Sequence, residues 1–418
     1  MALSRRQFLQ ACGLGVLSVA TAGSLVGCGG SGSDGGSAAA GGTANAQKPV
    51  VFYNRQPSNS STGDLDMTTL KWNDNTYYVG FDAKQGGELQ GQMVVEYIKA
   101  HAADIDRNGD GIIGYVLAIG DVGHNDSIAR TRGCRKALGT AVEKDGQIIS
   151  DPVNNKDGKS DKVKDGEIEV DGKKFIVREL ASQEMKTSAG ATWDAPTAGN
   201  ALSGAWASDL GDQIDIVISN NDGMGMSMYS NWAKENKVPV FGYDANSDAV
   251  AALGDSDFPY SGTISQNPAV QAYLTLRLLR NALDGVDVNT GVGKADDAGN
   301  VIAEDDFKYS EEDRSFYAMN LEVTADNYKD FTDPANTLYE TAQAQLDEKD
   351  NPKKKVWLSI YNSADNFLGS TYKPLLEKYA PLLNLDLEVV QGDGQNESSV
   401  TNKLGNPADF DAFAINMV

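Results

Sequence analysis

An acidic loop in the first third of the chain carries side chains that could bind a metal ion. Asp106, Asn108 and Asp110 place oxygen atoms at every second position, and the backbone carbonyl of Ile112 follows. Calcium prefers oxygen ligands, and a calcium-binding loop begins with this spacing. The pattern is not completed, because Gly114 offers no side-chain oxygen. The spacing therefore predicts either a calcium site completed by a carboxylate from elsewhere or a polar turn without a metal.

Polar residues also follow several of the apolar runs. After residues 112–119, a Gly-rich turn leads into His124, Asp126 and Arg130, and the last two share one helix face because of their i, i+4 spacing. Other apolar runs are followed by a polar residue as well, namely Asn54, Asn221, Asp244 and Asp365. One such residue would be ordinary turn or cap chemistry. Their repetition predicts a binding site at the carboxyl ends of parallel strands.

The elements that must position these residues alternate along the chain. Strand-like runs at 49–53, 115–119, 215–219 and 238–243 are interleaved with segments whose apolar residues recur at helical spacing. This alternation predicts an α/β fold with parallel sheets covered by helices on both faces. The length of the chain after residue 47 indicates two domains.

Two stretches depart from that alternation. Residues 141–180 are expected to form a charged hairpin insertion, and residues 285–312 form a second, acidic and Gly-rich one. Neither has a pattern that indicates a function.

The N-terminus has the features of an export signal. Arg5 and Arg6 precede a small and apolar run that ends at Cys28, which is typical of a twin-arginine signal with a lipoprotein processing site. We expect residues 1–27 to be removed, Cys28 to be lipidated and residues 28–47 to form a flexible tether. The alternative is an uncleaved transmembrane helix, but a Gly-rich stretch follows the run instead of a positively charged flank.

The overall charge narrows the classes of partner. The chain has a formal net charge of −23 at pH 7, which argues against binding to nucleic acid or to anionic lipid through charge. Once Cys12 is removed and Cys28 is lipidated, Cys134 is the remaining thiol. No intramolecular disulfide is expected in the mature chain.

Taken together, these segments resemble a known family. The chain is similar to the galactose/glucose-binding proteins of bacterial ABC transport, within the periplasmic binding protein superfamily. The resemblance covers most of the chain outside the two insertions and the termini. It is carried by the motifs KPVVFYNRQPS, NTYYVGFD, DIDRNGDGIIGYVLAIGDVGHNDSIARTR, ATWDAP, IDIVISNNDGM, VPVFGYDAN, SGTISQN and VWLSIYNSADNF.

The order of these motifs differs from that of the family. The segment like VWLSIYNSADNF opens the family's mature proteins, whereas here it begins the last part of the chain, 355–418. The resemblance therefore implies a circularly permuted type I periplasmic binding protein, with two Rossmann-like parallel-sheet lobes joined by a hinge. The crossover helix expected at the break is missing or reduced, which would expose one sheet face.

The resemblance also implies domain boundaries. Lobe 1 would comprise 48–82, 265–300 and 355–418, lobe 2 would comprise 83–264 and 313–333, and a permutation linker would span 334–354. The hinge crossings are expected near 81–83, 264–266 and 300–315.

The family's sugar-contacting residues map onto strand ends and loops of this chain. They fall on Asn54, His124, Asp126, Arg130, Trp193, Asn221, Asp244, Gln266, Asp365 and Phe367. Gln266 stands where the family has Asn. For Trp193 alone, a place in the core is the alternative to stacking on a sugar. The family's calcium ligands map onto Asp106, Asn108, Asp110 and the Ile112 carbonyl, and Asp215 would supply the missing carboxylate.

The expected function is to capture D-glucose or D-galactose outside the cytoplasm and deliver it to an ABC permease. We expect the protein to be a monomer that is lipid-anchored to the membrane through Cys28. Carboxylates, amides, arginine and histidine suit sugar hydroxyls, and two aromatic rings suit the apolar faces of a pyranose. Alternatives are a sugar sensor that signals to a chemoreceptor or kinase, and a receptor for another monosaccharide such as ribose or xylose. A glycosidase using Asp126 and Asp365 is disfavoured, because hydroxyl binding accounts for each of these acids and no nucleophile motif is present.

Overall fold

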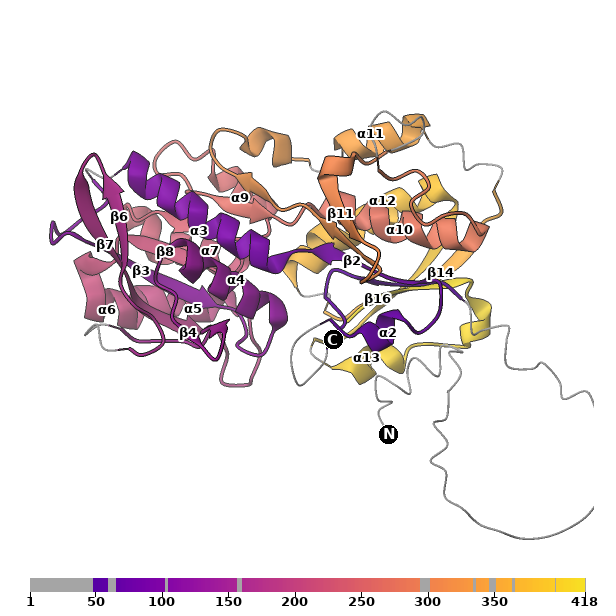
Figure 1. Ribbon diagram of the computed structural model, residues 1–418, viewed down its shortest axis with the longest axis horizontal. Helices are drawn as coiled ribbons and strands as arrows, with labels where there is room; N and C mark the ends of the chain where they lie inside the picture. Colours follow the sequence, from indigo (N-terminus) through magenta and orange to yellow (C-terminus); the bar gives the residue numbers. More distant parts are fainter. Residues whose placement is uncertain are drawn as a thin grey trace, which may run out of the picture.

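The computed structural model describes residues 48–58, 65–101, 104–155, 160–293, 301–333, 336–345, 351–362, 365–394 and 396–417. The expected signal peptide, Cys28 and the tether lie outside these residues, as does part of the expected linker 334–354. Figure 1 shows two α/β lobes side by side, each built on a mostly parallel sheet. Within the described residues, none of the helices combines the length and the apolar character needed to cross a bilayer.

Lobe 1 is built on a seven-stranded sheet. Its strands, in spatial order, are β11 (Phe307–Ser310), β12 (Ser315–Ala318), β2 (Thr76–Phe81), β1 (Val50–Tyr53), β16 (Ala412–Asn416), β14 (Lys354–Ile360) and β15 (Leu385–Gln391). All neighbours are parallel except β11 and β12, which form an antiparallel hairpin. The N-terminal strand β1 lies between β2 and the C-terminal strand β16, so the two ends of the described chain meet in the middle of this sheet.

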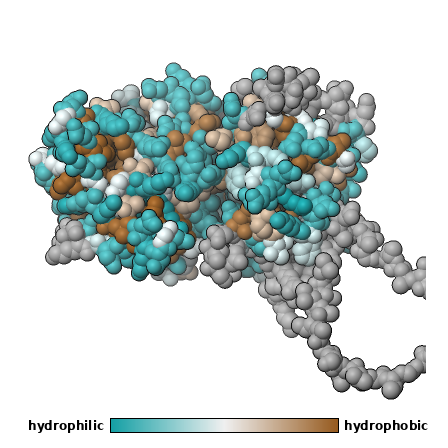
Figure 2. Space-filling model, in the orientation of Figure 1, coloured by the Kyte–Doolittle hydropathy of each residue, from teal (hydrophilic) through white to brown (hydrophobic). Residues whose placement is uncertain are grey.

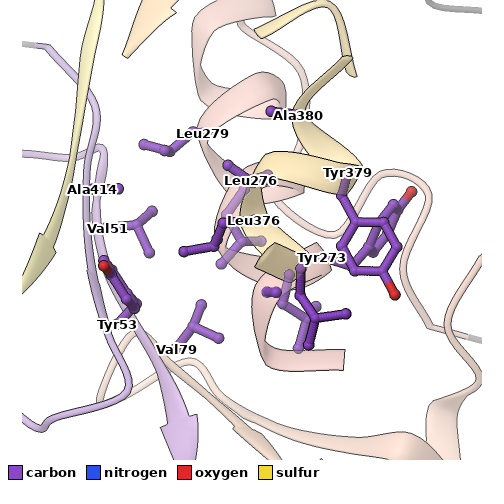
Figure 3. Packing of buried hydrophobic residues seen from close by; sticks show 14 of the residues in the cluster. Val51, Tyr53, Val79, Tyr273, Leu276, Leu279, Leu376, Tyr379, Ala380 and Ala414 are labelled. Atoms are coloured by element: carbon purple, nitrogen blue, oxygen red, sulfur yellow. The ribbon is translucent and has the colours of Figure 1, made fainter. Parts of the chain in front are cut away.

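Helices cover both faces of the lobe 1 sheet. On one face, α10 (Pro268–Asp284), α11 (Asn336–Gln345) and α12 (Lys373–Tyr379) form the larger core, in which Leu276 and Leu376 lie against Val51 of β1 (Figure 3). The long helix α10 begins with a proline, whose fixed φ suits the first turn, and ends at Gly285 in the left-handed region (φ 68°).

The other face of this sheet corrects an expectation. The sequence predicted an exposed face, but Trp357 and Phe413 are fully buried there. The short helices α2 (Met67–Leu70) and α13 (Glu397–Thr401) and the residues beside them cover the face. Short local segments therefore cover a surface for which the sequence indicated no long helix.

Lobe 2 is built on a five-stranded sheet. Its strands, in spatial order, are β6 (Gly166–Val170), β7 (Lys173–Glu184), β3 (Ile112–Ile119), β8 (Ile216–Ser219) and β9 (Val240–Phe241), with β6 antiparallel to β7. Helices α3 (Ala83–Ala100) and α4 (Asn125–Ala137) pack on one face. The other face is covered by α5 (Ala195–Ala201), α6 (Ala207–Leu210), α7 (Asp222–Met228), α8 (Lys234–Asn236) and α9 (Ser247–Ala252), with short irregular helices between them.

The stretch 141–180 is more than an insertion. Its first part forms the small hairpin β4 (Glu143–Lys144) and β5 (Gln147–Ile148). Its second part supplies β6 and most of β7, and β7 pairs with the central strand β3 along its length. The expectation of a separate charged hairpin missed this strand because it begins with two exposed lysines, whereas Phe175 and Val177 point into the core.

Within the described ranges, three chain crossings join the lobes. The first is at Asp82, between β2 and α3, and the second follows β10 (Thr263–Ser265), before α10. The third lies between β12 and β13 (Leu321–Val323), and β13 pairs antiparallel with β10. It was expected at 300–315, with 313–333 in lobe 2; instead β12 pairs with β2 in the lobe 1 sheet. The apolar pattern of SFYA fits a buried strand in either lobe, and pairing alone decides which.

Candidate functional site

The ends of strands from both lobes converge on one cavity. The described residues that line it are Asn54, Arg55, His124, Asp126, Arg130, Trp193, Asn221, Asp244, Gln266, Tyr361, Asp365, Phe367 and Leu368. Every residue in the set expected to contact a sugar is among them. The structure therefore brings together side chains from segments as distant in sequence as Asn54 and Asp365, and their contact with a sugar stays a prediction.

Local structure explains how these side chains reach the cavity. His124 and Asn221 are the N-cap residues of α4 and α7, and each accepts a backbone N–H from its own helix. Asn54, Trp193 and Asp244 have φ angles of 60°, 60° and 108°. Positive φ is unfavourable for residues with a side chain and gathers at functional sites, where the surrounding structure enforces it. These residues therefore form turns or cap helices and also line the cavity.

A buried ion pair forms the floor of the cavity on the lobe 2 side. The Arg130 Nη1 donates to the carbonyl of Asn220 at 2.7 Å and to Asp244 Oδ1 at 3.2 Å. Its guanidinium lies 3.7 Å from the centroid of the Tyr243 ring. The Arg130 Nε is shielded from solvent and has no acceptor within the described residues. An unpaired buried donor is costly, so this nitrogen favours a ligand that brings an acceptor.

Gln266 spans the cavity. Its Nε2 donates to Asp244 Oδ1 at 2.6 Å, and its Oε1 accepts from Asn54 Nδ2 at 3.3 Å. The free space left between the lining side chains is about 50 Å³. A sugar ring needs more room than this, so its entry requires Gln266 to swing aside or the lobes to separate.

Aromatic rings lie on opposite lobes. Trp193 meets the His124 ring edge-on, with 5.4 Å between centroids, and its backbone N–H donates to Gly120. A Cβ on Gly120 would lie 2.2 Å from the indole, so this approach requires glycine. Trp193 is only partly buried and lines the cavity, which places it at the edge of the core and not inside it. Phe367 comes from lobe 1 and is buried.

Burial sets the protonation of the ionisable groups. It raises the pKa of Asp126 and Asp365, and it raises that of Asp244 to about 7 against the opposing effects of Arg130 and Gln266.

The histidine of the cavity is neutral. Burial and then the charge of Arg55 lower the pKa of His124, so its imidazole carries no charge. Because His124 Nδ1 accepts the backbone N–H of Asp126, the neutral ring carries its proton on Nε2. The cavity thus offers carboxylate acceptors and at least two donors.

Three lining residues were missed by the sequence reasoning: Arg55, Tyr361 and Leu368. Arg55 follows Asn54 directly, and its guanidinium lies 5.5 Å from the centroid of the Tyr361 ring. Tyr361 is the first residue after β14. The rule that singled out Asn54 and Asp244 applies to both positions, so the strand-end signal was present. Leu368 carries no such signal, because an apolar residue in a helix is ordinary.

The acidic loop has a different geometry. Asp106 accepts backbone N–H groups from residues 109–111, and Asp110 accepts one from Ile112. Asp215 is buried and accepts from the backbone of Arg107 and Gly114.

The charges in this loop are compatible with a cation. Burial first, and the nearby charge of Asp106 among the further causes, raise the pKa of Asp215 to about 7. A cation would relieve this repulsion, and Asn108 and the Ile112 carbonyl would add neutral oxygen ligands. However, among the described residues no three acidic, His or Cys side chains gather as a metal cluster. Calcium therefore stays a prediction.

Comparison with known proteins gives the following matches. A family model described as a periplasmic binding protein domain matches residues 35–287, and a second model with this description matches residues 353–418. The D-galactose/methyl-galactoside binding periplasmic protein MglB of Haemophilus influenzae is 26% identical over 248 residues, which cover 58% of this chain and 59% of that protein. The chain thus spans less than two thirds of the length of this relative.

Two further matches are more limited. A xylitol-binding protein of Mycolicibacterium smegmatis is 32% identical over 102 residues, which cover 24% of this chain and 28% of that protein. The crystal structure of an ABC transporter periplasmic solute binding protein from Actinobacillus succinogenes with bound D-allose is 15% identical. The match covers 68% of this chain and 71% of that one, with a TM-score of 0.42.

Proposed function

The chain belongs to the periplasmic binding protein family, whose members bind solutes outside the cytoplasm and are not enzymes, and from this premise we propose that it captures D-glucose or D-galactose between its lobes for an ABC permease. The observation that carries the proposal is the single cavity lined by Asp126, Asp244, Asp365, Arg130 and Trp193. This combination suits a pyranose better than it suits an ion or an apolar ligand.

Binding would use groups that the protein does not fully satisfy by itself. Both of the hydrogen bonds that Asp244 receives from Arg130 and Gln266 go to Oδ1, so Oδ2 would accept a sugar hydroxyl. The Arg130 Nε and the His124 Nε2 would donate to sugar oxygens. Trp193 and Phe367 would cover the two apolar faces of the ring with little loss of side-chain entropy.

Lobe closure would hold the sugar in place. The Asn125 side chain at the start of α4 donates to Ser58 of lobe 1, so a contact between the lobes lies close to Asp126. The ligand would stabilise this closed arrangement because it touches residues of both lobes at once. The three chain crossings would serve as the hinge.

A smaller ligand is the second candidate. Gln266 narrows the cavity where the shorter Asn of the family would leave more room, which favours a pentose or a polyol over a hexose. The relatives named for galactose and for xylitol are consistent with either size. A sensor that presents the same sugar to a chemoreceptor or kinase would use the same cavity.

We extend the proposal to the attachment and the architecture of the chain. Cys28 would anchor the mature protein to the membrane by a lipid, and replacing Cys28 with Ser should release it into the soluble fraction. The circular permutation is supported by the two family matches and by the pairing of β1 with β16. Calcium held by Asp106, Asn108, Asp110, the Ile112 carbonyl and Asp215 would fasten the loop before β3 to lobe 2.

Calorimetry against a panel of monosaccharides tests the proposal. We expect one-to-one binding of D-glucose or D-galactose, and no hydrolysis of aryl glycosides. Preferential binding of ribose, xylose or xylitol would establish the second candidate instead. Absence of binding to any monosaccharide or polyol in the panel would refute the sugar-binding proposal.

A further inference from the structure

A groove lies beside the sugar cavity along the junction of the two lobes. It shares Asp126 with the cavity and has a volume of about 570 Å³. Small-molecule sites occupy roughly 300–1,000 Å³, so the groove has the size of a ligand site in its own right. Its lobe 2 wall consists of the start of α3, one side of α4 and the β4–β5 hairpin. Its lobe 1 wall includes Tyr78 and Tyr317.

The lobe 2 wall contains a donor without an acceptor. Arg132 Nη2 donates to Gln147 Oε1 of the hairpin at 3.2 Å. The Arg132 Nε is shielded from solvent and has no acceptor within the described residues. A guanidinium nitrogen in this position is stabilised by an oxygen of a ligand. Farther along α4, Lys136 pairs with Glu88 of α3 at 2.7 Å, so both charges stand on the same wall.

The lobe 1 wall offers an aromatic surface. Tyr317 of β12 is half-buried and meets Tyr78 edge-on, with 5.9 Å between ring centroids. The Tyr78 hydroxyl donates to the backbone carbonyl of Asn54 at 2.9 Å, so this wall is fixed to a residue of the sugar cavity. On the face seen in Figure 2, the junction between the lobes is mostly hydrophilic.

We propose that this groove is a second sugar subsite, and that the ligand is a hexose linked to a further sugar residue. The inference rests on the proposed function of the inner cavity, and it specifies how far the ligand extends. Like that cavity, the groove is lined by an arginine whose Nε has no acceptor within the described residues, by carboxylates and by aromatic rings. Asp126 belongs to both spaces, so the glycosidic bond would lie beside it.

The subsite also gives the β4–β5 hairpin a role. Gln147 and Ile148 form part of the groove wall, and Gln147 holds Arg132. Without the hairpin, the groove would open to solvent at this end. Because the two walls belong to different lobes, closure would clamp the second sugar as it clamps the first.

Calorimetry on the purified full chain tests the subsite. The ligands are D-glucose, D-galactose and a panel of α- and β-linked disaccharides of these sugars. We expect at least one disaccharide to bind. Loss of a charged hydrogen bond should make Arg132→Ala weaken that disaccharide by about tenfold. Gln147→Ala and Tyr317→Ala should weaken it in the same direction, and all three variants should leave monosaccharide affinity within about twofold.

The controls separate this inference from the proposed function. Arg178→Ala removes a matched arginine whose partner, Asp165, lies outside the groove, and it should change neither affinity. Gln147 is exposed, so its variant keeps the test valid if Arg132→Ala does not fold. Binding of monosaccharides without any disaccharide would overturn the subsite and leave the proposed function intact. Equal effects on both ligand classes, or no effect on either, would also overturn it. Absence of all sugar binding would refute both proposals.

Discussion

The sugar cavity and the acidic loop 106–112 contain similar residue types, but they differ in where those residues come from. In the cavity, Asp244, Arg130 and Asp365 arrive from separate segments of the chain, and the Arg130 Nε has no acceptor in the part of the chain that the structure describes. In the loop, Asp106 and Asp110 are neighbours in sequence and accept backbone N–H groups of their own turn. Groups that are close in sequence can satisfy one another locally, whereas groups gathered by the fold depend on a ligand or on each other.

Removal of Arg130 should have the largest effect. Arg130→Met leaves the buried Asp244 carboxylate without its cation, which should reduce the unfolding free energy by about 3–5 kcal/mol. Truncating one partner of a buried charge pair should weaken sugar binding by about 100-fold or more. Denaturant unfolding and calorimetry measure the two effects. Arg178→Met is the matched control, and sugar affinity within twofold of the wild-type value would show that Arg130 does not contact the ligand.

Trp193→Ala should have the next largest effect. Loss of a stacking surface should weaken binding by about 1–3 kcal/mol without a comparable loss of stability, because the indole lies at the edge of the core. The matched control is Trp232→Ala, since Trp232 packs against the same core without lining the cavity. An equal loss of affinity in both variants would place Trp193 among the residues of the core.

Replacing Asp244 with Asn should change the pH dependence of the unfolding free energy. Its pKa of about 7 in the fold lies above the usual 3.8, so the folded protein holds more protons between these pH values. The free energy of unfolding should therefore fall as pH rises from about 4 to 7. Asp244→Asn should flatten this slope in urea titrations at a series of pH values. Asp215→Asn should flatten it too, since that pKa is also about 7. A slope unchanged in Asp244→Asn would exclude a proton on this group.

The smallest effect should come from calcium. If the loop binds the ion, excess calcium should raise the Tm by about 2–4 °C, and Asp215→Asn should abolish the rise. Scanning calorimetry in calcium and in chelator measures it. An equal Tm in both conditions would show that the loop is a polar turn that binds no calcium. The loop would then satisfy its polar groups by itself, whereas the cavity depends on a ligand.

Much of the fold could be predicted from local patterns, and the errors share one cause. The strand-like runs at 49–53 and 215–219 were expected almost where β1 and β8 lie, because apolar spacing reports local structure. The membership of β12 in lobe 1, and of β7 in the lobe 2 sheet, was missed. Both strands are defined by the neighbour with which they pair, and that neighbour is distant in sequence.

The candidate site divides in the same way. The strand-end rule pointed to Asn54, Asn221 and Asp244, and the resemblance added Trp193 and Phe367. The strand-end rule also applied to Tyr361 but was not extended to it, and neither source indicated that Gln266 spans the cavity. The direction of a side chain after its strand ends depends on residues that are distant in the sequence and adjacent only in the fold. The space available to that side chain depends on the same residues.

The sequence by itself determined the kinds of residue available, the alternation of strands and helices, and the turns and caps that hold polar groups at strand ends. These depend on interactions within a few residues. The tertiary structure alone decided that those ends meet in one cavity and that a groove lies beside it. Such outcomes depend on contacts between segments hundreds of residues apart, such as Asn54 and Gln266, whose meeting is set by the pairing of whole strands.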